Sequence, residues 1–331
     1  MHIRFLRRNL PKLVVALSLL GVWPLQSWSQ NAPWPSKPVR ILVPFPAGGS
    51  TDLVARFIAQ GLSEKFGQQF IVDNRAGAGG NIGTDAVAKA LADGYTIGLS
   101  TSGPLVNNKF LYKTMPFDSD KDLSPIALVC EIPLVITSNP AKVSAMNLKE
   151  FLRQAKANPQ SFTVGQPGNG TIGHLALEQL SIVTKTPLTH IPFRGDTPAM
   201  TDLLGGNIQA LSAPITAFIP NLSAGKLRGL AVTSSARYPG LPEIPTAKEQ
   251  GIDLVATVWF GIVGPAGLPA DIAKKLNAEV NAIVGSTYGR AKLQTYGAVV
   301  NLGSPELLRQ MIQEDSLKWQ KVITVAKVVA N

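Results

Sequence analysis

The starts of two helices carry the chemistry that this sequence offers most plainly. In residues 43–52, VPFPAGGSTD, an apolar strand is joined to a helix by a loop with Pro46, Gly48 and Gly49. The first N–H groups of a helix have no partner inside the helix and lie at the positive end of its dipole. Such a junction suits an anion, and carboxylate or phosphate are the obvious candidates. A plain turn, in which the glycines only satisfy backbone geometry, is the alternative that this segment alone leaves open.

A second glycine-rich junction lies in residues 164–180, VGQPGNGTIGHLALEQL. Gly168 and Asn169 precede Thr171, which can cap a helix while leaving other N–H groups open. His174 follows one turn later. A single histidine at this position either packs against or caps the helix, or it lines a ligand site, and the residues alone leave both open.

A third loop adds charge. Residues 192–196, PFRGD, end another predicted strand and carry Arg194 and Asp196. With a helix start in each half of the chain and an arginine beside one of them, a molecule with a carboxylate at each end could bridge the halves. Charge-assisted hydrogen bonds contribute roughly 1.5–3 kcal/mol each. Three or four of them, less the cost of immobilising the ligand, reach the roughly −8 kcal/mol of micromolar binding.

Alternating strands and helices must position these loops. In the N-terminal half, strands are predicted at residues 39–45, 70–73 and 95–99, and helices at 51–66 and 81–91. Such alternation is typical of parallel βαβ units with helices on both faces of a sheet. A second set has predicted helices at 148–157, 171–184 and 198–204, strands at 162–165, 190–193, 208–212 and 229–233, and tail helices at 269–283 and 305–323.

Two apolar, extended segments resemble crossovers between lobes, residues 132–139 and 258–265. The chain then enters a second lobe once and returns once, so the first lobe is discontinuous. We therefore predict an α/β fold of two lobes joined by a two-segment hinge over a cleft. Lobe one is predicted to comprise residues 36–133 and 260–331, and lobe two residues 134–259.

Residues 1–29 are predicted to be a signal peptide. Four basic residues precede an apolar run at 13–25, and Ser27 and Ser29 are the small residues that a signal peptidase reads. The run is shorter than the roughly 20 apolar residues that a membrane span needs. We expect cleavage near Gln30 and a periplasmic mature protein, with a retained membrane anchor as the alternative.

The composition of the 331-residue chain excludes several classes of protein. Hydrophobic residues make up 45% and charged residues 16%, which argues against disorder. The net charge of +10 becomes +6 when the four basic residues of the predicted signal peptide are removed. This moderate positive charge fits attraction of anionic ligands as easily as nucleic acid, but no basic-aromatic run typical of nucleic-acid binding follows the signal peptide. Cys130 is the only cysteine, so we expect a buried thiol and no intrachain disulfide. No metal-ligand spacing is present among the three histidines, and neither a metal nor a cofactor is predicted.

An enzyme is not predicted either. Residues 77–83, GAGGNIG, follow a strand and open a helix, but Ile82 stands where the third glycine of G-x-G-x-x-G belongs. No serine lies in a G-x-S-x-G elbow, and neither Cys130 nor His174 has a readable catalytic partner. A binding protein is therefore favoured over a catalyst.

Eight motifs, taken together, carry a resemblance to a known family. They are residues 34–56, 74–83 (NRAGAGGNIG), 92–98 (ADGYTIG), 168–176 (GNGTIGHLA), 192–208 (PFRGDTPAMTDLLGGNI), 224–234 (AGKLRGLAVTS), 241–251 (LPEIPTAKEQG) and 259–269 (WFGIVGPAGLP). With them, the sequence resembles the extracytoplasmic substrate-binding proteins of tripartite tricarboxylate transporters, the Bug receptor family. The match covers essentially the whole mature chain, in order and without large gaps.

The resemblance implies two Rossmann-like lobes of the type II periplasmic binding protein kind. They close on a small organic acid, often a dicarboxylate, an aromatic acid or an acidic amino acid. Members hold the ligand's carboxylate with the first-lobe loop, partly through ordered water, and with the glycine loop of the second lobe. With the third loop included, the candidate ligand-binding residues are Phe45, Ala47, Gly48, Gly49, Thr51, Asp52, Thr101, Ser102, Gly168, Asn169, Thr171, His174, Arg194 and Asp196.

The chain departs from the family in two places. Asp196 stands where many members have a small residue, and if it faced the cleft it would favour a ligand with an amine or a ring nitrogen. The alternative is that Asp196 or Thr197 caps a helix that begins at Pro198. At residues 212–214, SAP, relatives often show an aromatic-acidic pair, whereas Ala213 cannot accept a hydrogen bond from a ligand amine. The relatives' substrate preferences therefore do not transfer.

The predicted function is that of a periplasmic solute-binding receptor for a small organic carboxylate. The resemblance implies delivery to a membrane permease with one large and one small subunit. We expect a monomer that does not bind nucleic acid. The alternative is a ligand-sensing receptor that acts through a membrane sensor kinase, since both functions use the same cleft and the same motion.

Overall fold

Three parallel strands organise the first half of the fold. The computed structural model describes residues 34–158 and 162–330, and from Pro35 onward the chain is one compact unit. The elements of this half are β1 (Val39–Val43), α1 (Ser50–Phe66), β2 (Phe70–Asn74), η2 (Ala78–Gly80), α2 (Asn81–Ala88), β3 (Thr96–Thr101), η3 (Gly103–Asn107) and α3 (Asn108–Leu111). Strand β1 pairs in parallel with β2 on one side and with β3 on the other. The predicted βαβ alternation is confirmed here.

Local sequence explains why β1 and α1 form. Strand β1 reads VRILV, a nearly continuous apolar run of the kind found where both faces of a parallel sheet are covered. On α1, Val54, Ile58 and Leu62 recur four residues apart and are all buried, so one stripe of the helix packs on the sheet. The helix ends at Gly67, whose left-handed backbone suits a C-terminal cap. Strand and helix therefore hold the glycine loop between two fixed ends.

The second half repeats the same construction. Its elements are α4 (Leu148–Ala157), β5 (Thr163–Gln166), α5 (Ile172–Thr184), β6 (Thr189–Pro192), α6 (Asp196–Gly205), β7 (Ala210–Pro214), η5 (Ile215–Ala217), α7 (Ile219–Ser223), β8 (Arg228–Val232) and η6 (Lys248–Gln250). Strand β5 pairs in parallel with β6 and β7. The two halves thus each present strand-to-helix loops at the carboxyl ends of parallel strands.

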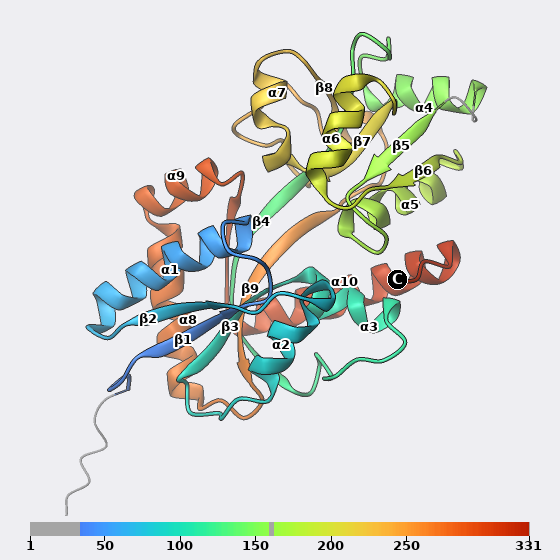
Figure 1. The fold of residues 1–331 in the computed structure, drawn as a ribbon. Coiled ribbons are helices and arrows are strands. Elements are labelled where there is room, and N and C mark those ends of the chain that lie inside the picture. The colour runs from blue at the N-terminus through green and yellow to red at the C-terminus, as the bar shows by residue number, and fades with distance from the viewer. Residues whose placement is uncertain (1–33, 159–161, 331) are drawn as a thin grey trace, which may run out of the picture. The chain divides into compact units, whose positions relative to one another are not determined.

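Two antiparallel strands connect the halves. They are β4 (Leu123–Ser138) and β9 (Thr257–Pro265), and Figure 1 shows them running side by side between the two groups of strands. From Leu123 to Pro133, β4 pairs with β9, and from Leu134 to Ser138 it pairs with β7. The predicted extended crossovers are confirmed, but β4 begins nine residues before the predicted start at 132, because its first part also belongs to the first sheet.

The tail returns to the first half of the fold. Its elements are α8 (Ala270–Gly285), α9 (Thr287–Thr295), β10 (Val299–Gly303) and α10 (Pro305–Ala326). Strand β10 pairs antiparallel with β4, and α8 packs against α1 and β4. Ser304 caps α10 as predicted, with its side chain accepting a hydrogen bond from the N–H of Leu307. The first lobe is therefore built from both ends of the chain.

The core runs through the crossover strands. Trp259 of β9 and Trp319 of α10 are among the largest fully buried side chains, and Cys130 of β4 is buried as predicted. The indole Nε1 of Trp259 donates to Oδ2 of Asp315 on α10 at 2.7 Å. A buried indole N–H needs such a partner. This bond ties the tail helix to the strand that connects the lobes.

These features make the fold an α/β architecture of two Rossmann-like lobes joined by two crossover strands, as predicted. The lobe limits at 133/134 and 259/260 stay a prediction. The predicted signal peptide, residues 1–29, lies outside the described residues. Within the described ranges, no helix is both long and apolar enough to cross a membrane.

Some predicted boundaries were wrong. Helix α2 ends at Ala88, not at residue 91, and β3 runs from Thr96 to Thr101, two residues beyond the predicted end. The added residues, Ser100 and Thr101, are polar yet buried, so the apolar pattern did not include them. This extension matters because it carries Thr101 to the edge of the candidate site.

Candidate functional site

The loop between β1 and α1 leaves the start of the helix without a side-chain cap. Gly49 is the N-cap residue, and no side chain caps the helix. Gly48 has a φ of 83°, a left-handed conformation that favours glycine. No atom lies within 4 Å of the place where a Cβ on Gly48 would stand, so the loop is open there. An uncapped, open helix start offers the N–H groups that an anion requires.

Asp52 supports this loop from inside. Its Oδ2 accepts hydrogen bonds from the N–H of Gly48 and from Nε of Arg56, both at 2.9 Å. Burial acts to raise the pKa of Asp52, but the hydrogen bonds from Arg56 and Gly48 outweigh it and hold the pKa below its ordinary value. Asp52 is therefore an ionised, buried group that shapes the loop.

The loop between β5 and α5 is also fixed by its own side chains. Thr171 is the N-cap residue of α5, as predicted, and its Oγ1 accepts from the N–H of His174 at 3.4 Å. The same hydroxyl donates to the carbonyl of Gly168 at 2.7 Å. The N–H of Gly170 donates to Nδ1 of His174 at 3.1 Å. His174 therefore holds the loop from behind.

Behind this loop, His174, Glu178 and His190 form a hydrogen-bonded group. Oε1 of Glu178 lies 3.2 Å from Nε2 of His174 and 2.9 Å from Nδ1 of His190. Burial acts to raise the pKa of Glu178, but the hydrogen bonds from the two histidines lower it to about 2. The carboxylate thus connects α5 to β6 close to the start of α5.

The same three side chains have ligand atoms within 4.8 Å of one another, which raises the question of a metal ion. Nδ1 of His174 already accepts the N–H of Gly170, so the proton of the neutral ring is on Nε2, which donates to Glu178. A metal would need the lone pair of that same Nε2. The donor set therefore does not suit a metal and serves as a hydrogen-bonded link.

In the third loop, the prediction that Asp196 or Thr197 caps the following helix was wrong. Helix α6 begins at Asp196, not at Pro198, and its N-cap is Gly195 with a φ of 106° and no side-chain cap. Because Asp196 already lies inside the first turn, neither it nor Thr197 is the N-cap residue. Asp196 is partly buried, and burial raises the pKa of its carboxyl group. Arg194 is exposed.

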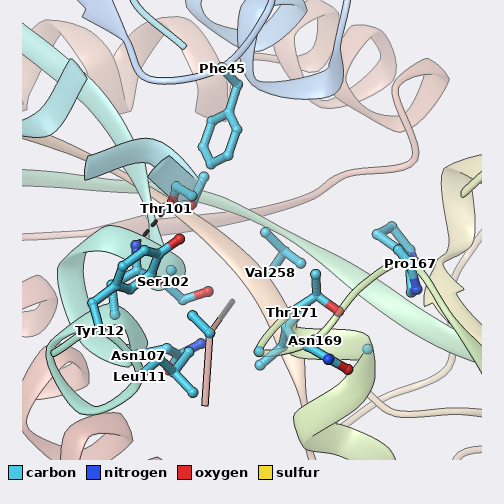
Figure 2. A pocket seen from close by; sticks show the side chains of 18 of the residues that line it. Phe45, Thr101, Ser102, Asn107, Leu111, Tyr112, Pro167, Asn169, Thr171 and Val258 are labelled. Atoms are coloured by element: carbon cyan, nitrogen blue, oxygen red, sulfur yellow. Dashed lines mark hydrogen bonds between the residues drawn. The ribbon is translucent and has the colours of Figure 1, made fainter. Parts of the chain in front are cut away.

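Two adjoining cavities lie where these loops meet. The first has a volume of 280 Å³, and Figure 2 shows Phe45, Thr101 and Tyr112 on one side of it with Asn169 and Thr171 on the other. In the first half, its residues come from the β1–α1 loop, η2, β3, η3 and α3, together with residues that directly follow β3 and α3. In the second half, they come from the β5–α5 loop and from α5, α6 and β7. Val258 of β9 and Ala330 near the end of the chain complete the lining. Both halves of the fold therefore form its wall.

The second cavity has a volume of 610 Å³ and includes the first glycine loop. Gly48, Gly49 and Thr51 line it from the first half, and Thr216 and Ile219 line it from the second. The two cavities share the lining residues Phe45, Thr101, Asp196 and Val258.

The structure places most of the candidate residues at these cavities, but not all. Those that line one or both cavities are Phe45, Gly48, Gly49, Thr51, Thr101, Ser102, Asn169, Thr171 and Asp196. Those that line neither are Ala47, Asp52, Gly168, His174 and Arg194. In the second group, Asp52 and His174 each form a hydrogen bond with the backbone of their own loop. Contact of any of these residues with a ligand stays a prediction.

Several lining residues were not predicted as site residues. Asn107, Leu111 and Tyr112 follow β3, and the residue pattern GPLVNNKFLY gave no sign of a site there. Tyr296 and Ala330 come from the tail, more than 100 residues beyond the loops that they meet. Val258 lies in a predicted crossover. Its position between the lobes could have identified it as a site residue.

The family assignment rests on a comparison over nearly the whole chain. Residues 54–328 match the family model described as "Tripartite tricarboxylate transporter family receptor". The chain belongs to this family. It is also 37% identical over 292 residues to Protein BugT of Bordetella pertussis, an alignment that covers 88% of this chain and 89% of BugT. The resemblance to the Bug receptors is thereby confirmed, and the family is one of solute-binding receptors.

Solved structures agree with the fold. R. palustris Rpa4515 with adipate superposes with a TM-score of 0.79 at 34% identity, covering 89% of this chain and 99% of that one. The periplasmic binding protein BugD superposes with a TM-score of 0.74 at 32% identity, covering 90% of this chain and all of BugD (100%). Both share the fold of this chain over nearly their whole length, and the family's members are periplasmic solute-binding proteins.

Proposed function

We propose that this protein is a periplasmic receptor that captures a small organic carboxylate between its two lobes. The expected ligand is a dicarboxylate, an aromatic acid or an acidic amino acid. The receptor then delivers the ligand to a tripartite tricarboxylate transporter permease with one large and one small subunit. The mature chain starts near Gln30 and acts as a monomer with lobes at 36–133 plus 260–331 and at 134–259.

One observation carries the proposal: each cavity is lined from both halves of the fold. Phe45 and Thr101 lie opposite Asn169 and Thr171 around the first cavity. A ligand in that position contacts both lobes at once, and therefore stabilises the arrangement in which the lobes are close. Ligand binding between two lobes is the general way in which hinged binding proteins report occupancy.

The chemistry of the walls suits a carboxylate. The open start of α1 supplies backbone N–H groups, and Thr101, Ser102 and Asn107 supply neutral donors. Charge-assisted hydrogen bonds from such donors contribute roughly 1.5–3 kcal/mol each, so three or four reach micromolar affinity after the cost of immobilisation. The relative Rpa4515 was solved with adipate, a small dicarboxylate, which supports the ligand class.

A thermal-shift panel tests the ligand class. Because binding to the folded state alone raises the melting temperature, a carboxylate at 100 times its Kd adds about 2.7 kcal/mol of stability, a rise of several degrees. We expect small carboxylates to give this rise and sugars or polyamines to give none. The reverse pattern would contradict the proposal.

Transport is tested separately from binding. Vesicles that contain the cognate large and small permease subunits should take up a labelled carboxylate only when the loaded receptor is added. Binding without receptor-dependent uptake would leave the ligand class intact and refute the delivery step.

A further inference from the structure

Asp196 occupies a special place in the site. It is the first residue of α6 and one of the four residues that line both cavities. Phe45, Thr101 and Val258, the other three, are uncharged. Any ligand that fills the space where the cavities meet therefore lies beside this carboxyl group.

Among the described residues, one oxygen of the Asp196 carboxyl group has no hydrogen-bond donor. Its Oδ1 is inaccessible to solvent and has no hydrogen-bond partner among the described residues. In the part of the chain that the structure describes, no positively charged residue offsets the burial that raises the pKa of Asp196. Arg194, two residues earlier, is exposed and lines neither cavity. A buried carboxylate without a partner costs free energy that a suitable ligand recovers.

The walls around Asp196 carry no other charged side chain among the described residues. Among the described residues that line the two cavities, Asp196 is the only Asp, Glu, Lys, Arg or His. A dianionic ligand therefore meets uncharged donors and a single carboxylate of its own sign. Two like charges at close range repel each other more strongly in such a site than in bulk water.

We propose that Asp196 selects carboxylates that also carry a protonated nitrogen. The ligand's carboxylate takes the N–H groups and hydroxyls of the glycine loops, and its ammonium group pairs with Asp196. This inference rests on the proposed function and narrows its ligand class. Asp196 is thus a specificity-determining residue, and dicarboxylates are the disfavoured class.

Structural roles do not account for the side chain. The N-cap position of α6 belongs to Gly195, and no side chain caps the helix. An acidic residue in the first turn stabilises a helix, and an exposed aspartate provides that effect without burial. The buried, unpartnered oxygen is explained by a cation that arrives with the ligand.

Three matched pairs of compounds test the inference by isothermal titration at pH 7. They are 3-aminopropanoate with succinate, 4-aminobutyrate with glutarate, and 5-aminopentanoate with adipate. In each pair a nitrogen replaces the second carboxyl carbon, so length is constant and only the distal charge changes. We expect the best ammonium ligand to bind the natural protein at least about tenfold more tightly than its dicarboxylate partner.

Variants assign the preference to Asp196. Asp196→Asn keeps the shape of the side chain and should abolish or reverse the tenfold preference. Asp202→Asn removes the same charge from the same helix at a residue that lines neither cavity and bonds to Asn207. This control should leave the preference unchanged.

The outcomes separate the two hypotheses. If dicarboxylates bind the natural protein as tightly as their ammonium partners, or if Asp196→Asn leaves the ranking unchanged, the inference is overturned and the proposed function stands. If no carboxylate of any kind binds, the proposed function fails and the inference fails with it. The ranking on the natural protein alone decides the matter should Asp196→Asn not fold.

Discussion

At the scale of single residues, the site separates groups that face a ligand from groups that hold a loop. Asp52 and His174 are the titratable residues of the two glycine loops, yet each forms a hydrogen bond with the backbone of its own loop. Gly48 and Gly49 carry no side chain and line the second cavity directly. The residues expected to meet the ligand are therefore mainly backbone groups and neutral donors, with Asp196 as the charged exception.

Gly48→Val should weaken carboxylate binding by about tenfold or more while leaving the protein folded. The φ of 83° is strained for a β-branched residue, so the loop must shift and its N–H groups lose their alignment. The Kd from titration calorimetry checks the effect. Gly251→Val is the matched control, since Gly251 has a φ of 76°, open space around it and no place in either cavity. Equal losses of affinity in both variants would remove the loop from the site.

The raised pKa of Asp196 predicts that the stability of the ligand-free protein depends on pH. Its folded pKa is raised above the ordinary value of 3.8, so its contribution to stability is fully present below that pH and is lost as pH rises through the folded pKa. Asp196→Asn has no such loss. We expect the variant to gain stability relative to the natural protein as pH rises from about 4 to 7, measured by urea unfolding. A constant difference across this range would contradict the assigned burial.

At the scale of elements, each loop is positioned by the strand and helix that it joins. In the second half, Glu178 accepts hydrogen bonds from His174 on α5 and His190 on β6, so one carboxylate fixes the start of the helix relative to the next strand. The N–H of Gly170 donates to His174, and the hydroxyl of Thr171 donates to the carbonyl of Gly168, so both groups are fixed within the loop. The loop is therefore positioned by contacts within the protein itself.

Glu178→Gln should lower the free energy of unfolding at pH 7 by about 1–3 kcal/mol, since hydrogen bonds to a charged group are lost. The folded pKa of about 2 lies below the ordinary 4.5, so this contribution is present above pH 4.5 and is lost as pH falls through about 2. Urea unfolding should show the gap between natural protein and variant closing in that window. Glu243→Gln, at an exposed position, is the control and should show no gap.

At the scale of the whole molecule, the crossover strands and the tail make the two lobes interdependent. Strand β4 belongs to both sheets, and β9 pairs with it from Leu123 to Pro133. Helix α10 bonds to β9 through Asp315 and Trp259, and Ala330 beyond that helix lines the first cavity. The tail thus stabilises the connection between the lobes and completes the site.

Asp315→Ala should destabilise the protein by about 1–3 kcal/mol, because the buried indole N–H of Trp259 loses its acceptor. A lower midpoint in urea unfolding, followed by tryptophan fluorescence, measures the effect. Glu314→Ala, at the exposed neighbouring position of the same helix, should change the midpoint little. If both variants behave alike, the Trp259 hydrogen bond does not stabilise the crossover.

The βαβ alternation, both crossovers, the glycine loops and the cap at Thr171 could all be predicted from the order of the residues. These features depend on periodicity, on positive-φ glycines and on hydrogen bonds between residues close in sequence. Short segments of the sequence contain all of these signals. Polar residues at the buried end of β3 broke the apolar pattern, so that boundary was missed.

Which polar groups reach the cavities follows from the folded structure. There, Asp52 and His174 bond to the backbone of their own loops, and α6 begins at Asp196. Folding also brings Tyr296 and Ala330 from the tail to the site. The physical reason is that a side chain's direction depends on the partners that packing brings to it. Those partners come from segments far apart in the chain, and their proximity is a property of the folded molecule alone.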